Sequence, residues 1–191
     1  MTFKRITVKF FARYENALSA DEVFQIFNHW ISAAQGETLI DVADYSHIND
    51  GPVTLLIGHE ADYATDISDG QLGLLYTRKQ PWQGDQAAQL SLSVQAALNA
   101  CRRLEEDALL GGNTRFNSNQ FQLGCLDRLN APNTDETLAS IQEDVGALLN
   151  KLFGGATCSI ERDPDPKRFF KLSIKAESTL DTAALLHNIS S

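Results

Sequence analysis

The chain has 191 residues, of which 43% are apolar, and a formal net charge of -9. A chain of this length can bury a sizeable core, as one domain or as two small packed units. Between Arg13 and Arg78 there is no lysine or arginine, although carboxylates are frequent there, whereas binding to a phosphate backbone requires clustered cations. No apolar run approaches the roughly 18 residues of a membrane span. These features argue against binding to nucleic acid and against insertion in a membrane.

The N-terminal residues and the cysteines indicate the compartment. Charges interrupt every apolar stretch near the N-terminus, so we predict no secretory signal, which needs an apolar region of about 7–15 residues. The three cysteines, Cys101, Cys125 and Cys158, are widely spaced and form no CxxC pair. We therefore expect a cytoplasmic protein whose cysteines serve as small buried apolar side chains.

The first half begins with an alternating pattern and a capped helix. Residues 5–11 alternate with a period of two, which predicts a half-buried strand with Ile6, Val8 and Phe10 on its core face. Ser19-Ala20-Asp21-Glu22 then forms a capping-box pattern. It predicts the start of a helix whose buried stripe is made of Phe24, Phe27, Ile31 and Ala34.

Strand-like runs and one long helix complete this half. Residues 39–48 and 53–63 are joined by Asn49-Asp50-Gly51-Pro52, and Asp-Gly favours a tight hairpin turn. Residues 72–77 predict a third short strand. Apolar residues in steps of four and three from Leu90 to Ala108 predict a long amphipathic helix, which ends at Gly111-Gly112.

The second half repeats the pattern. Its predicted elements are a strand over 121–126, a helix opened by Asn133-Thr134-Asp135-Glu136, strands over 158–162 and 169–176, and a short helix capped by Ser178.

The two halves, residues 1–112 and 113–191, share the order strand, capped helix, hairpin, helix. This order resembles the ferredoxin-like split βαβ arrangement. We therefore predict an α+β fold made of two ferredoxin-like units in tandem, with antiparallel or mixed sheets and helices packed on one face. A homodimer formed through a sheet face or edge is compatible with this fold. A fold does not by itself determine a function.

The first hairpin carries an unusual number of carboxylates. Strands disfavour aspartate and glutamate, and locally costly residues are expected where a protein functions. A tight turn at Asp50-Gly51 would pair residues whose numbers sum to about 101, which places His59 near Asp41 or Val42. His47 would lie close to the turn and far from His59.

Our leading hypothesis is a small-molecule site in a cleft near this hairpin. His59 would act as a general acid or base together with Glu60 or Asp62. Arg78-Lys79 would supply cations for an anionic ligand. The predicted ligand-binding residues are Asp44, His47, Tyr63, Arg78 and Lys79.

Three other interpretations of the hairpin stay open. His59 and Glu60 could simply form hydrogen bonds at a strand end. The acidic half could belong to a non-catalytic module that binds a basic protein. His59 or His47 could bind a metal or a noncovalent haem, although HExxH and CxxCH are both absent. We assign no metal ligands and name no cofactor.

Overall fold

The computed structural model describes residues 3–14 and 18–191. Within these residues the chain forms eight β-strands, four α-helices and two short 3-10 helices. The first half contains β1 (Ile6–Ala12), α1 (Ala20–Ala33), β2 (Leu39–Asp44), β3 (Pro52–Gly58), β4 (Ala61–Asp66), η1 (Ser68–Gly70), β5 (Gly73–Arg78), α2 (Gln86–Glu106) and η2 (Ala108–Leu110). The second half contains β6 (Phe116–Cys125), α3 (Asp135–Phe153), β7 (Cys158–Arg162), β8 (Phe170–Ala176) and α4 (Thr182–Ser190).

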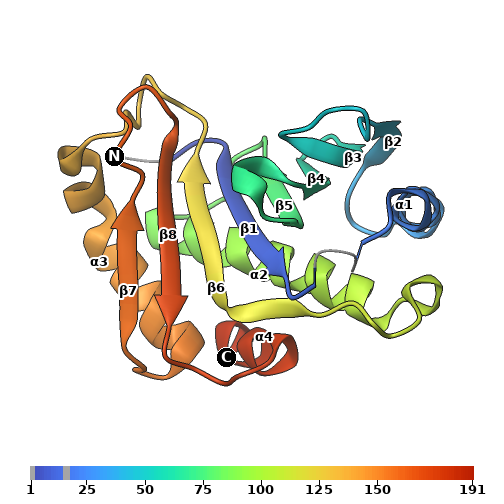
Figure 1. The fold of residues 1–191 in the computed structure, drawn as a ribbon. Helices are drawn as coiled ribbons and strands as arrows, with labels where there is room; N and C mark the ends of the chain where they lie inside the picture. Colours follow the sequence, from blue (N-terminus) through green and yellow to red (C-terminus); the bar gives the residue numbers. More distant parts are fainter. Residues whose placement is uncertain (1–2, 15–17) are drawn as a thin grey trace.

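All eight strands belong to one antiparallel sheet with the order β2-β3-β4-β5-β1-β6-β8-β7. The two halves of the chain meet at β1 and β6, which lie side by side in Figure 1. The predicted α+β class and antiparallel pairing are confirmed. A single sheet therefore runs through both halves.

One face of the sheet forms the core with the helices. A row of buried side chains crosses seven neighbouring strands through directly paired residues: Val42, Leu56, Tyr63, Tyr76, Val8, Leu123 and Leu172. The helices pack their buried residues into the same cluster, and Figure 1 shows α2 and α3 behind the sheet. The Trp30 ring of α1 meets the Tyr63 ring edge-on at 6.1 Å between centroids.

The start of α1 differs from the prediction. The Ser19 side chain makes no capping hydrogen bond, so the predicted capping box is wrong. The buried stripe is also displaced, because Val23, Ile26, Phe27 and Trp30 face the sheet while Phe24 is 38% exposed. The contact between Trp30 and Tyr63 turns the helix by about one residue relative to the stripe read from the sequence.

Helices α3 and α4 begin at capping side chains. Thr134 Oγ1 accepts a hydrogen bond from the Thr137 N–H at 3.3 Å, as the sequence predicts. Helix α4, in contrast, is capped by Asp181, which accepts from the Ala184 N–H at 2.8 Å. The predicted cap, Ser178, instead accepts a hydrogen bond from the Leu180 N–H before the helix begins.

Candidate functional site

The predicted catalytic residues lie at a turn. The predicted strand over 53–63 is wrong as one element, because β3 ends at Gly58 and β4 begins at Ala61. His59 lies between these strands with an exposed side chain, and its N–H donates to the Thr38 carbonyl at 2.8 Å. The Glu60 carboxylate accepts from the Thr38 N–H at 3.0 Å, and this bond lowers the Glu60 pKa.

The hairpin register also differs from the prediction. Val42 pairs with Leu56, and Asp41 pairs with Ile57, so His59 is opposite neither Val42 nor Asp41. The cause is the connection between β2 and β3: residues 45–51 form a longer loop in place of a tight two-residue turn. The pairs from Asp41 to Asp44 are consequently shifted by three positions.

His47 and Asp44 lie at the other end of the β2–β3 pair. Asp44 accepts a hydrogen bond from the Ser46 N–H at 2.8 Å, which lowers its pKa. The His47 side chain is exposed, with its ring 6.4 Å from the Tyr45 ring. The two histidines of the hairpin are therefore separated by the length of β3.

The remaining predicted residues are divided between the two faces of the sheet. Tyr63 points into the core, where its hydroxyl donates to Glu37 at 2.8 Å and burial raises its pKa. Asp62 faces the other side and forms an ion pair with Lys79 at 2.8 Å. The Arg78 guanidinium stacks on the Trp82 ring at 3.6 Å.

Potential metal ligands do not gather in the part of the chain that the structure describes. Residues 3–14 and 18–191 contain no group of three or more His, Cys, Asp or Glu side chains that could hold an ion. Cys101 and Cys125 are buried, and burial raises the pKa of both thiols. No helix among these residues is both long and apolar enough to cross a membrane.

The face of the sheet opposite the helices carries a cavity of about 400 Å³, which we call the sheet-face cavity. Its apolar lining comes from Leu75, Leu126, Phe169 and Phe170. The polar and charged lining consists of Thr7, Lys9, Asp66, Ser68, Asp69, Thr77, Gln122, Asp163, Lys167, Arg168 and Lys171. A concave apolar surface with a few polar groups is the usual form of a small-molecule site.

A buried ion pair forms part of the cavity wall. Lys9 Nζ lies 2.6 Å from Asp66 Oδ1, and the two side chains are only 4% and 2% exposed. Lys9 also donates to the Ser68 carbonyl at 3.0 Å, and Asp66 accepts from the Ser68 N–H and hydroxyl at 3.1 and 2.9 Å. These bonds attach the loop after β4 to the centre of the sheet.

Two loops from different halves of the chain meet at the cavity rim. Arg168, which precedes β8, donates to Asp69 of η1 at 2.7 Å and to Asp163 at 3.0 Å. Lys171 also contacts both carboxylates, and its hydrogen bond is the main reason that the Asp69 pKa falls to about 2. This cluster of four charged residues, the rim cluster, joins segments about 100 positions apart in sequence.

The cavity carries more positive than negative charge. Four cationic side chains and three carboxylates line it, although the whole chain has a net charge of -9. Lys9 and Asp66 neutralise each other, so the excess belongs to the rim, where Lys167 makes no ion pair within residues 3–14 and 18–191. The cavity is thus suited to a negatively charged group.

Of the predicted site residues, Asp62 lies nearest to this cavity in the sheet. It pairs with Thr77, which lines the cavity, and therefore occupies the same face one strand away. The sequence did not predict Lys9 and Lys171 as site residues. Each alternates with core residues along its own strand, so its side chain was expected on the outer face of the sheet, away from the core. The pattern that could have identified Lys9 and Lys171 is a cationic residue at an outward-facing position in each of two strands of the same sheet.

The chain matches no protein-family model, and no curated protein matches it in sequence. Its class therefore rests on the structure: an α+β protein with one antiparallel sheet, helices packed on it and a ligand-sized cavity on the face away from the core.

Proposed function

We propose that the protein binds a small organic anion in the sheet-face cavity. The observation that carries this proposal is the combination of an apolar lining with surplus positive charge at the rim. The apolar part of the ligand would lie against Leu75 and Phe169, and its carboxylate or phosphate would contact Lys171 and Arg168.

The rim cluster makes the proposal specific. In the free protein Asp69 forms ion pairs with Arg168 and Lys171. A ligand anion would therefore compete with Asp69 for these cations. Removing the Asp69 charge should therefore strengthen binding, whereas removing either cation should weaken it.

The test uses the fluorescent probe 8-anilinonaphthalene-1-sulfonate, which combines an apolar body with an anionic group, and its displacement by octanoate or octanol. We expect one saturable site, with octanoate displacing the probe at least tenfold better than octanol, because a charge-assisted hydrogen bond contributes about 1.5–3 kcal/mol. Lys171→Met and Arg168→Met should weaken octanoate about tenfold, and Asp69→Asn should strengthen it several-fold.

Lys175→Met is the matched control, since Lys175 lies on the same strand and the same face but does not line the cavity. Its octanoate affinity should stay within twofold of the wild type. Equal displacement by octanoate and octanol, or weaker binding in Asp69→Asn, would overturn the proposal. Circular dichroism of each variant keeps loss of fold separate from loss of binding.

Acid–base chemistry at His59, Glu60 and Asp62 stays a separate prediction. The same titrations on His59→Ala and Glu60→Ala decide between the two locations: octanoate affinity should be unchanged if the sheet-face cavity is the site. A loss of affinity in these variants alone would favour the hairpin.

The division into two ferredoxin-like units is likewise a proposal. It is supported by the order strand, helix, antiparallel strands and helix in both halves, with four such strands in the first half and two in the second, and by the central position of the first strand of each half, β1 and β6.

A further inference from the structure

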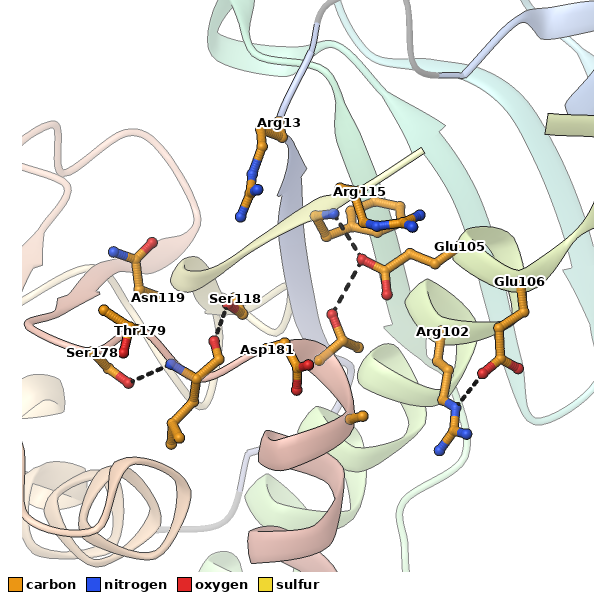
Figure 2. Close-up of a pocket in the computed structure, with 14 residues that line it drawn as sticks. Arg13, Arg102, Glu105, Glu106, Arg115, Ser118, Asn119, Ser178, Thr179 and Asp181 are labelled. Atoms are coloured by element: carbon orange, nitrogen blue, oxygen red, sulfur yellow. Dashed lines mark hydrogen bonds and ion pairs between the residues drawn. The ribbon is translucent and has the colours of Figure 1, made fainter. Parts of the chain in front are cut away.

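A second cavity, of about 500 Å³, lies at the opposite end of β6 from the β6–α3 loop. Figure 2 shows it among the end of β1, the C-terminal part of α2, the start of β6 and the segment before α4. Its lining is mainly charged and hydroxylated. The lining residues used below are Arg13, Glu105, Arg115, Asn119, Thr179 and Asp181.

Two arginines come to this cavity from paired positions. The Arg13 N–H donates to the Arg115 carbonyl at 2.8 Å, next to the paired residues Ala12 and Phe116 of β1 and β6. Neither guanidinium forms an ion pair with a carboxylate in the described parts of the chain, 3–14 and 18–191. A bound anion would supply a counter-charge to Arg13, while the Arg115 guanidinium donates to the Thr114 carbonyl at 2.6 Å.

Uncommitted neutral donors lie on the same side as Arg13. Figure 2 shows the Arg13 side chain extending from the end of β1 toward Ser118 and Asn119. Ser118 donates to the Leu180 carbonyl. The Asn119 amide and the Thr179 hydroxyl have no hydrogen-bond partner among the residues that the structure covers. Arg13, Asn119 and Thr179 therefore offer this cavity donors that no described residue uses.

Two of the three carboxylates that line the cavity, Glu105 and Asp181, are only half used, and the third, Glu106, forms an ion pair with Arg102 at 2.7 Å. Glu105 Oε1 accepts from the Phe116 N–H at 2.9 Å and from the Thr182 hydroxyl at 3.2 Å. Asp181 Oδ1 accepts from the Ala184 N–H at 2.8 Å. The second oxygen of each carboxylate has no partner within the described residues, so it can accept from ligand hydroxyls.

We propose that this second cavity binds a small hydroxylated molecule with a phosphate group, in the class of the sugar phosphates. The phosphate would be held by Arg13 with Asn119 and Thr179, and the hydroxyls by Glu105 and Asp181. The phosphate is favoured over a carboxylate because its larger charge and its three terminal oxygens match Arg13 and several neutral donors.

The experiment measures binding of ribose 5-phosphate, ribose and inorganic phosphate by isothermal titration calorimetry. Ribose 5-phosphate should bind at least tenfold more tightly than either of the other two, because only it uses both the cations and the carboxylates. Arg13→Gln should weaken ribose 5-phosphate at least tenfold, Arg13→Lys should lose less, and Asn119→Ala should weaken it several-fold.

Arg5→Gln is the matched control, because Arg5 is an exposed arginine just before the other end of β1, roughly 25 Å away at about 3.3 Å per residue. Its affinity should stay within twofold of the wild type. Two results would overturn the proposal. One is no binding of ribose 5-phosphate at 10 mM, which is roughly the weakest affinity a specific site would show. The other is an equal loss of affinity in Arg13→Gln and Arg5→Gln. Octanoate titration of Arg13→Gln separates this result from the sheet-face cavity, whose octanoate affinity should not change.

Discussion

Breaking the buried pair of Lys9 and Asp66 should destabilise the protein severely. The two side chains are 4% and 2% exposed, so Lys9→Met leaves the Asp66 carboxylate with hydrogen bonds from Ser68 but without a counter-ion. Removing one partner of a buried ion pair costs about 3–5 kcal/mol, and we expect the lower half of that range because Ser68 keeps donating. For a chain of this length the loss corresponds to a fall in Tm of roughly 10 °C.

Urea unfolding followed by tryptophan fluorescence measures this effect, since Trp30 is buried in the core. Asp66→Leu alone should also be destabilised, because it leaves the Lys9 ammonium buried without its carboxylate. The double variant Lys9→Met/Asp66→Leu should recover most of the loss, because an apolar pair of similar size removes both desolvated charges. A Lys9→Met variant with wild-type stability, or a double variant that loses the sum of the single losses, would refute this reasoning.

Two further predictions concern the rim cluster and the centre of the sheet. The lowered Asp69 pKa, about 2 against an ordinary 3.8, stabilises the fold above pH 4 and ceases to do so as the pH falls from about 4 to about 2. After solvent screening this contribution is about 1 kcal/mol. Between pH 5 and pH 2 the free energy of unfolding of Asp69→Asn should therefore fall by about 1 kcal/mol less than that of the wild type. Gly73→Ala should cost about 1–3 kcal/mol in urea unfolding, because its Cβ would lie 2.4 Å from the Phe10 carbonyl oxygen. Gly146→Ala is the control, since its Cβ meets nothing within 4 Å and should stabilise α3 by roughly 0.5–1 kcal/mol; equal losses in the two would contradict the steric argument.

Most helices and strands were predicted because the patterns that mark them, periodicity and capping residues, involve residues close together in the sequence. The predicted strands over 158–162 and 169–176 agree with β7 and β8 to within one residue. Helix α1 shows where such patterns stop being sufficient. Its residues offer two neighbouring apolar stripes, and the choice depends on Trp30 packing against Tyr63, which is 33 positions away in the chain.

The predicted register of the hairpin is wrong for a different reason. Its geometry depended on one assumed turn, and a loop over 45–51 shifts every residue pair of β2 and β3. The carboxylates that looked costly in strands are explained by local bonds: Glu60 binds the Thr38 N–H, and Asp62 binds Lys79. An excess of carboxylates in a strand therefore indicates unusual bonding, which need not be catalytic.

Both cavities lie where the halves of the chain meet, and this explains why neither was visible in the sequence. The pairing of β1 with β6 brings Lys9 beside Gln122 on the sheet-face cavity, and brings Arg13 beside Arg115 on the other. In each case the partners are more than 100 positions apart, so no motif of fixed spacing connects them. Each half alone would supply only part of the charged lining. If both proposals hold, pairing the two halves of the chain through β1 and β6 creates binding sites that neither half has.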